Sequence, residues 1–330
     1  MRTGRPRVPV GSGPAVVALG GGHGLAVTLR ALRAVTDQLT AVVGMADDGG
    51  SSGRLRRDLG VPPPGDLRMA LAALCGDDAW GRTWSSVVQH RFADAGDLSG
   101  HAVGNLLITA LWERTGDVVG GLDWVAALLG AHGRVLPVST QGLEIVAEVW
   151  DTPEHPDQLV TVRGQATVAV TPGIVRRIMI EPPDPPACPE AIAAIGAAEA
   201  LVMGPGSWYT SVMADMLVPG IRDAFIASEA RKILVLNLVA QSGETAGFSP
   251  QGHVQVLHSA FPELRFDAVL ADPDHVPDAE VLRDACALLG AELRLEPVSD
   301  SQAPPGHHDP LLLGRAFASL LGRGSIPAWR

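Results

Sequence analysis

The chain has 330 residues, 46% hydrophobic and 18% charged, which excludes a disordered protein and allows one large α/β domain or two smaller ones. The formal net charge of -11 argues against a general nucleic-acid surface, because phosphate backbones attract an excess of lysine and arginine. No uninterrupted apolar run is long enough to span a bilayer. A small anionic ligand remains compatible with an acidic protein, since a local cluster of arginines and backbone N–H groups can bind it.

The terminal segments and the cysteines indicate the cellular compartment. Residues 1–13 are basic and rich in glycine and proline, and lack the apolar segment of a signal peptide, so we expect a flexible tail. We expect residues 323–330 to form a second tail and residues 14–322 to form a single domain. The three cysteines are far apart, with no CxxC pair, which argues against a disulfide framework or a zinc ribbon. A reducing compartment, the cytoplasm, fits this pattern.

The first elements form a strand–helix–strand unit. Ala15–Leu19 is a short apolar run stopped by glycines, which predicts a buried parallel strand. Leu25–Val35 carries leucines at helical spacing, and Thr40–Ala46 is a second apolar run. Such a unit is typical of the beginning of a doubly wound fold.

The next region is predicted to be a long loop followed by helices. The stretch ADDGGSSGRLRRDLGVPPPGD is assigned to a loop, and a helix is expected from about Leu67, with Asp66 as its N-cap. A helix over roughly Gly100–Trp112 is expected to bury Val103, Leu107 and Leu111, and Gly120–Leu129 is expected to be helical.

The pattern changes between about residues 135 and 181. The short runs LEIVAEVW, QLVTVRG, ATVAV and RRIMIE are separated by glycine, proline and aspartate, which predicts an antiparallel β section attached to the main sheet. Pro182–Pro189 is expected to be a rigid connector.

The α/β alternation then returns. We expect buried strands at Ala200–Met203, Ile233–Leu238 and Phe266–Leu270, and an edge strand at Leu293–Pro297. The last helix begins after Asp309, an N-cap followed by the proline favoured at the first helical position. The predicted fold is therefore a doubly wound, Rossmann-like, mostly parallel sheet with an antiparallel β section.

A first glycine loop follows the first strand. The candidate ligand contacts here are Gly21, Gly22, His23 and Gly24. Glycines allow a ligand to approach the backbone closely, and the helix N-terminus that follows favours phosphate. The loop is neither the G-x-G-x-x-G dinucleotide motif nor a Walker A loop. A tight turn that binds nothing is the alternative.

A second polar loop follows the second strand. Asp47 and Asp48 stand where an acid takes ribose hydroxyls, or where a magnesium ion bridges phosphates. The following residues offer N–H, hydroxyl and guanidinium donors: Gly49, Gly50, Ser51, Ser52 and Arg54. A solvated acidic turn is the alternative.

Further polar residues stand near two helix starts. Asp66 and Arg68 are candidates at the first. His101, Gly104 and Asn105 are spaced to share one helix face, which indicates either a pocket wall or a buried polar cluster.

A third glycine loop follows the strand at Ala200–Met203. It supplies Gly204, Gly206, Ser207 and Thr210, with Trp208 and Tyr209 either stacking on a base or packing on the sheet. The strand after it leads into Asn237, Gln241, Glu244 and Thr245, so a site in a crevice at the strand ends is expected. His307, His308 and Asp309 are better explained by a helix cap than by a metal site, and Asp272, Asp274 and His275 by an exposed turn.

Six motifs in order carry a resemblance to a known family: GGGHG, ADDGGSSGRLR, PPGDLR, GHAVGNLL, GPGSWYTSV and NLVAQSGETAGF. From about Ala15 to about Leu321 the sequence resembles the gluconeogenesis factor family (YvcK type), which is related to the CofD-like 2-phospho-lactate transferases of deazaflavin cofactor synthesis. The resemblance implies a CofD-like fold that binds UDP-activated sugars such as UDP-N-acetylglucosamine. It also implies a role in cell shape and cell-wall metabolism during growth on gluconeogenic carbon sources.

The resemblance assigns nucleotide contacts to Gly21, Gly22, Gly24, Asp48, Ser51, Ser52, Asn105, Gly204, Gly206, Ser207, Asn237 and Thr245. Two departures matter. His23 stands where many members carry threonine, and the transferase relatives lack the Gly-Gly-Ser-Ser-Gly-Arg loop. The second departure argues against transferase activity more than against nucleotide binding.

The leading hypothesis is a UDP-sugar-binding regulatory protein without turnover, expected to form a homo-oligomer. The second is a phospho-lactate-type transferase, in which Mg²⁺ held by Asp47 and Asp48 would neutralise the phosphates. A nicotinamide oxidoreductase is a weaker third, because the dinucleotide motif is missing.

Overall fold

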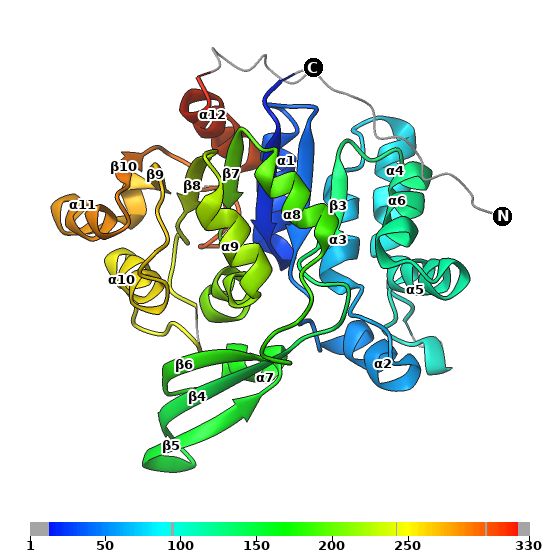
Figure 1. Ribbon diagram of the computed structural model, residues 1–330, viewed down its shortest axis with the longest axis horizontal. Helices are drawn as coiled ribbons and strands as arrows, with labels where there is room; N and C mark the ends of the chain where they lie inside the picture. The colour runs from blue at the N-terminus through cyan, green and yellow to red at the C-terminus, as the bar shows by residue number, and fades with distance from the viewer. Residues whose placement is uncertain (1–12, 94–95, 242, 301, 323–330) are drawn as a thin grey trace.

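The computed structural model describes residues 13–93, 96–241, 243–300 and 302–322. The predicted tail 323–330 and all but the last residue of the tail 1–13 lie outside the described residues. Within them, seven parallel strands form the main sheet, in the order β10-β9-β8-β7-β1-β2-β3 (Figure 1). Their bounds are β1 Val16–Gly20, β2 Leu39–Val43, β3 Arg134–Pro137, β7 Ala200–Met203, β8 Arg231–Val235, β9 Ala268–Ala271 and β10 Glu292–Leu295.

The strand order reverses between β1 and β7. From β1 the chain runs outward to β2 and β3, and from β7 it runs the other way to β8, β9 and β10. In open parallel sheets, ligands bind at the carboxyl ends of the strands where the order reverses. The glycine loops after β1 and β7 lie at this point. The doubly wound prediction is confirmed.

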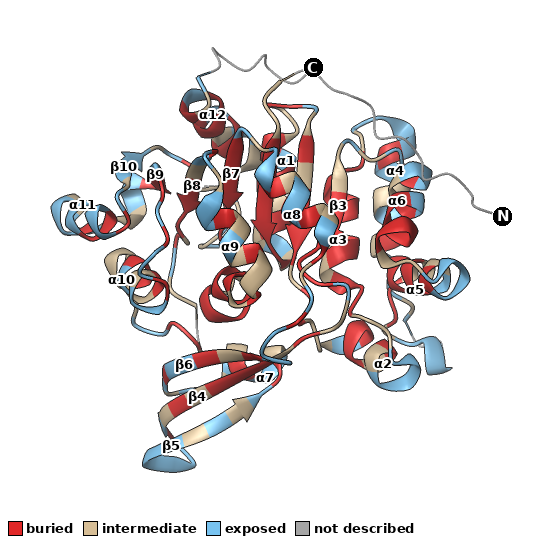
Figure 2. Cartoon of the chain, in the orientation of Figure 1, coloured by how far each residue is buried: buried red, intermediate tan, exposed pale blue. Residues whose placement is uncertain are grey.

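Helices cover both faces of the sheet because each parallel crossover is right-handed and the two halves run in opposite directions. On one face α1 (Gly22–Leu32) packs against α3 (Gly65–Ala73) and α12 (Pro310–Leu320), and on the other α8 (Pro189–Gly196) packs against α9 (Pro219–Ala227). The central strands are buried along their length (Figure 2). The remaining α-helices of the main body are α2 Gly50–Leu59, α4 Ala79–Gln89, α5 Val103–Thr115, α6 Val118–Leu129, α10 Pro250–Ala260 and α11 Ala279–Leu288.

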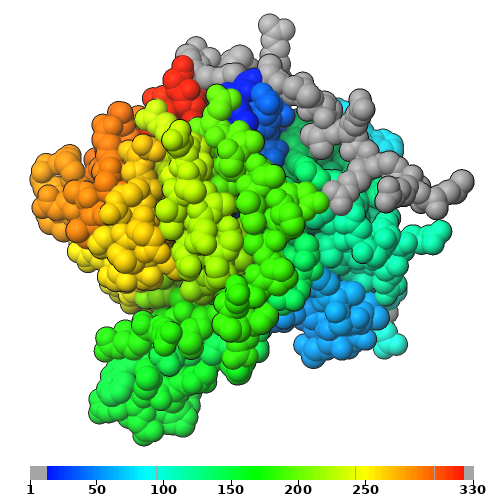
Figure 3. Space-filling model, in the orientation of Figure 1, coloured from blue at the N-terminus to red at the C-terminus, as the bar shows by residue number. Residues whose placement is uncertain are grey.

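The antiparallel section is a separate three-stranded sheet in the order β5-β4-β6. Its strands are β4 Glu144–Thr152, β5 His155–Arg163 and β6 Ile174–Glu181. It projects from the main body as a lobe, visible in the space-filling view (Figure 3). Two details of the prediction were wrong. Residues 134–137 belong to the parallel sheet, and ATVAV lies in a short helix, α7 (Gln165–Val170).

Three further expectations need correction. The loop predicted before Leu67 contains α2, which buries only one large apolar side chain, Leu55, and ends at the left-handed Gly60. Asp66 is not the N-cap of its helix, because α3 begins one residue earlier, at Gly65. In α5 the most buried residues are Gly104, Asn105, Ile108, Thr109 and Trp112, whereas Val103, Leu107 and Leu111 are only partly buried.

The cap predicted for the last helix was right. Asp309 accepts hydrogen bonds from the backbone N–H groups of Leu311 and Leu312 and so caps α12. The three cysteines are free and buried. Among the described residues, no helix is long and apolar enough to cross a membrane. The exposed turn predicted for Asp272 was wrong. The side chain is buried and accepts hydrogen bonds from the N–H groups of Val298 and Ser299.

Candidate functional site

The first and third glycine loops meet at the point where the strand order reverses. A Cβ at Gly24 would overlap the carbonyl oxygen of Pro205, so only glycine allows the two backbones to approach this closely. The side chain of Asn237, after β8, fixes the third loop. It accepts from the N–H of Gly206 at 2.9 Å and donates to the carbonyl oxygen of the same residue at 2.8 Å. The ends of β1, β7 and β8 are thereby held together at one edge of the sheet.

A buried polar network connects α2, α3 and α5. Asn105 donates to the hydroxyl of Ser51 at 3.0 Å, and its carbonyl oxygen accepts from Nε of Arg68 at 2.9 Å. His101 Nδ1 lies 3.0 Å from the same Ser51 hydroxyl. Burial lowers the pKa of Arg68 to about 10, which leaves it protonated at neutral pH. His101 and Asn105 are therefore part of a buried polar cluster, which was one of the two alternatives expected from the sequence. Arg68 belongs to the same cluster.

Two acidic side chains meet at the start of α3. A Cβ at Gly65 would overlap Oδ2 of Asp47, and one at Gly21 would overlap Oδ2 of Asp66. Burial raises the pKa of Asp66 to about 7, and the charge of Asp47 raises it further, whereas the N–H of Gly22 acts in the opposite direction. Ionisation of Asp66 is therefore unfavourable below about pH 7.

A third acid, Asp215, lies deeper. It is 2% exposed, and its Oδ2 has no hydrogen-bond partner among the described residues. Burial raises its pKa well above the ordinary value, and Asp66 adds to the rise. Asp215, Asp66 and Gln165 all line a cavity of about 10 Å³, roughly the least that holds a water molecule. The sequence did not suggest Asp215, which lies beyond the third glycine loop, or Gln165, which follows a strand of the three-stranded sheet and not of the main sheet.

Asp48 has a different position from Asp47. Its Oδ1 accepts from the N–H of Ala166 at 2.8 Å, in the first turn of α7. The side chain therefore caps α7 and connects the loop after β2 to the three-stranded sheet. Gln165 adds a second connection, because its amide donates to the carbonyl oxygen of Thr210 at 3.1 Å.

The residues after β8 mostly support the third loop from below. Thr245 is fully buried and accepts from the N–H of Gln241 at 2.9 Å, and the Gln241 amide donates to Ser207 at 3.4 Å. Glu244 is 3% exposed. Burial raises the pKa of Glu244 to about 7, while the Thr210 hydroxyl and nearby backbone N–H groups lower it. Trp208 and Tyr209 are buried, so their rings pack inside the protein and are not available to stack on a base.

Helix N-termini near the site are open to an anion. The N-cap residues of α1, α2, α3 and α5, all within the described chain, make no side-chain hydrogen bond to their helices. Aspartates or a serine cap α4, α6, α10, α11 and α12. First-turn N–H groups without a capping side chain favour a bound phosphate. At α1 the carboxylate of Asp66 already faces the N–H of Gly22, acids lie at the start of α3, and the first turn of α5 is largely buried. The start of α2, with the exposed Gly50, is the most accessible of the four.

The predicted site residues thus divide into two sets. Those at least partly accessible are Gly22, His23, Gly24, Asp47, Asp48, Gly49, Gly50, Arg54, Asp66, Gly206, Ser207, Asn237 and Gln241. Those buried beneath them are Gly21, Ser51, Ser52, Arg68, His101, Asn105, Gly204, Thr210, Glu244 and Thr245. The first set is open to solvent, and the second lies beneath it in the fold.

Comparisons with known proteins decide the family. The model of the family described as 2-phospho-L-lactate transferase CofD matches residues 16–296. A Mycobacterium leprae protein named "Putative gluconeogenesis factor" is 50% identical over 93% of this chain and 86% of its own length. The gluconeogenesis factor of Bacillus subtilis is 35% identical over 82% of each chain. The chain belongs to the gluconeogenesis factor family.

A crystal structure of a family member supports the same assignment. A UPF0052 protein from Bacillus halodurans superposes with a TM-score of 0.80 and 32% identity, over 93% of this chain and 99% of that one. As a member of the gluconeogenesis factor family, the chain has the CofD-like α/β fold that the six motifs implied. Among the described residues, no group of three or more histidine, cysteine, aspartate or glutamate side chains is arranged to hold a metal ion.

Proposed function

We propose that this protein is a cytoplasmic regulator that binds a UDP-sugar, such as UDP-N-acetylglucosamine, in the crevice between the glycine loops after β1 and β7. The bound sugar nucleotide would report cell-wall precursor supply and so couple cell morphogenesis to growth on gluconeogenic carbon sources. The observation that carries the proposal is the contact between Gly24 and Pro205 at the reversal of strand order.

The diphosphate fits the α2 side of the crevice. The first-turn N–H groups of α2 have no side-chain cap, and Arg54 lies in the same helix, partly accessible. Ser51 and Asn105 fix the orientation of this turn from below. A phosphate there would meet backbone dipoles and a positive charge inside a protein that is acidic overall.

A magnesium ion is compatible with the acid pair. Two carboxylates complemented by water and phosphate oxygens are typical of Mg²⁺ sites. Burial first, and then the charge of Asp47, raise the pKa of Asp66, and a cation would favour its ionised form. Asp47 and Asp66 are the better pair, because Asp48 caps α7. When bound, the ion would neutralise the ligand phosphates.

The same acids favour a second candidate, a transferase of the phospho-lactate type. Asp66, with a pKa of about 7 beside Asp47, is suited to accept a proton from an attacking group once its own proton has left. This candidate uses the same crevice and differs only in whether the ligand is turned over.

Calorimetry with UDP-N-acetylglucosamine, GDP and NAD, with and without Mg²⁺, tests the proposal. We expect UDP-N-acetylglucosamine to bind and to remain intact after prolonged incubation, and NAD not to bind. Tight GDP binding together with turnover of a lactyl-phosphate donor and a deazaflavin acceptor would establish the transferase instead.

A further inference from the structure

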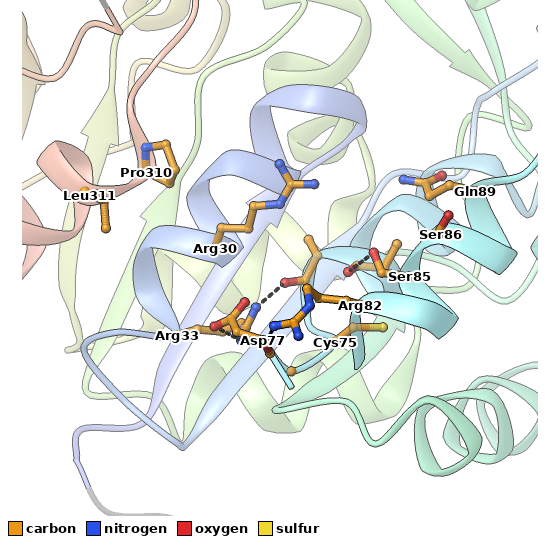
Figure 4. Close-up of a pocket in the computed structure, with 13 residues that line it drawn as sticks. Arg30, Arg33, Cys75, Asp77, Arg82, Ser85, Ser86, Gln89, Pro310 and Leu311 are labelled. Carbon is orange, nitrogen blue, oxygen red and sulfur yellow. Dashed lines mark hydrogen bonds and ion pairs between the residues drawn. The ribbon is translucent and has the colours of Figure 1, made fainter. Parts of the chain in front are cut away.

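A second pocket lies on the α1 face of the sheet, away from the glycine loops. It has a volume of about 520 Å³ and is formed by the end of α1, the α3–α4 connection, α4 and the start of α12 (Figure 4). Ligand pockets typically have volumes in this range. Helix α1 begins at the first glycine loop and ends at this pocket, so the length of the helix separates the pocket from the glycine loops.

The charge of the pocket is opposite to that of the whole protein. Arg30, Arg33 and Arg82 line it, with Asp77 as the only acid among its lining residues. Three arginines against one aspartate leave two positive charges, although the formal net charge of the chain is -11. A positively charged cavity in an otherwise acidic protein attracts anions to the cavity and not to the rest of the surface.

Two of the arginines are held in position by the connection between α3 and α4. Arg33 donates to the carbonyl oxygen of Ala73 at 3.3 Å and forms an ion pair with Asp77 at 2.9 Å. Arg82 donates to the backbone carbonyl of Asp77. Arg30 is exposed and pairs with no described residue. A guanidinium has five N–H donors, so Arg33 and Arg82 keep donors free after these bonds are made.

The rest of the lining is neutral. Ala72, Ala73, Pro310 and Leu311 give apolar contact, and Ser86 and Gln89 give uncharged polar groups. The volume is far larger than a phosphate ion needs, so an organic body would lie against these residues. The terminal segments 1–12 and 323–330 contain no aspartate or glutamate, so neither offers an acidic side chain to the arginines.

We propose that this pocket is a second ligand site, which binds a small organic phosphate ester with its dianionic phosphate between Arg30 and Arg82. A phosphate monoester matches the two surplus positive charges, and the planar guanidinium group matches phosphate geometry. The proposal does not depend on the ligand of the crevice.

Calorimetry with glucose 6-phosphate, 3-phosphoglycerate and inorganic phosphate tests the proposal in the full-length protein. At least one ester should bind more tightly than inorganic phosphate. In Arg30→Gln/Arg82→Gln its affinity should fall at least about tenfold, because two charge-assisted contacts are lost. Arg283→Gln, which removes an exposed arginine on α11, should leave the affinity unchanged.

A variant that keeps both arginines provides the second test. Leu311→Glu adds a negative charge at the rim of the pocket on an exposed position, so folding should be retained and binding weakened. The proposal is overturned if neither ester binds at millimolar concentration, if inorganic phosphate binds as tightly, or if the double variant binds like wild type. Competition between UDP-N-acetylglucosamine and the ester for a single site would overturn it as well.

Discussion

Asp66 and Asp215 line the same small cavity from two separate segments, and the charge of Asp66 helps to raise the pKa of Asp215. The first lies in the opening turn of α3, and the second lies beyond the third glycine loop. Both are acids that the folded protein prefers to keep protonated. Ionising Asp66 above its pKa of about 7 therefore strains this part of the fold, and a bound cation or a proton would relieve that strain.

This strain predicts an unusual dependence of stability on pH. The pKa of Asp66 is about 7 in the folded protein, against an ordinary value of 3.8. The folded state then binds the proton more tightly, so stability should be greatest below about pH 4 and fall as pH rises towards 7 as far as this group is concerned. In Asp66→Asn this contribution is absent.

Urea unfolding of wild type and Asp66→Asn at pH 5 and pH 8 measures the effect. The variant should gain stability relative to wild type at pH 8, and the gain should shrink at pH 5. Asp58→Asn, which alters an exposed carboxylate of α2, is the control. Identical differences between wild type and Asp66→Asn at the two pH values would show that Asp66 is not strained.

Asn237 should matter more for the third loop than its neighbour Gln241. Asn237→Ala removes two hydrogen bonds to Gly206 and should lower the free energy of unfolding by about 1–3 kcal/mol. Gln241→Ala removes only a long bond to Ser207 and should cost less. Chemical denaturation measures both, and an equal loss in the two variants would argue against Asn237 as the fixing residue.

Asp48 should act on the three-stranded lobe. Asp48→Ala removes the cap of α7 and should destabilise that helix locally by about 0.5–2 kcal/mol. Hydrogen exchange should become faster in residues 164–170 and stay unchanged in β1 and β7. The matched control is Asp184→Ala, at an exposed position. Faster exchange throughout the main sheet would mean that Asp48 supports the whole fold instead.

His23 offers a binding test that leaves stability intact. Its side chain is exposed in the first turn of α1, so His23→Ala should leave the melting temperature unchanged. We expect the affinity for UDP-N-acetylglucosamine to fall roughly three- to tenfold, the usual size of one lost polar contact. His155→Ala, at an exposed position of β5, should bind like wild type. Equal affinities in all three proteins would remove His23 from the site.

The strands were predictable because their signals are local. β1 and β7 are short apolar runs ended by glycine, and burial on both faces explains the absence of alternation. Helix α2 was missed because glycine, serine and arginine give it almost no apolar stripe. Helix α7 was missed because its sequence, QATVAV, favours a strand and its cap comes from Asp48, 118 residues away in sequence.

The site was predictable only in outline. The glycine loops predicted a ligand crevice at the strand ends, but the sequence could not distinguish the accessible residues of these loops from the buried residues beneath them. Asn105 and Arg68 are buried partners of each other. The charge of Asp47 acts on Asp66, whereas its neighbour Asp48 caps α7. Asp215 stands among apolar residues after the third loop, and only the folded chain brings it to the cavity.

The central claim, a sugar nucleotide bound at the reversal of strand order, is tested most directly by hydrogen exchange with and without UDP-N-acetylglucosamine. Exchange should become slower in residues 20–24, 49–54 and 204–211 and stay unchanged in residues 72–89 of the second pocket. Protection that spares all three glycine loops would contradict it.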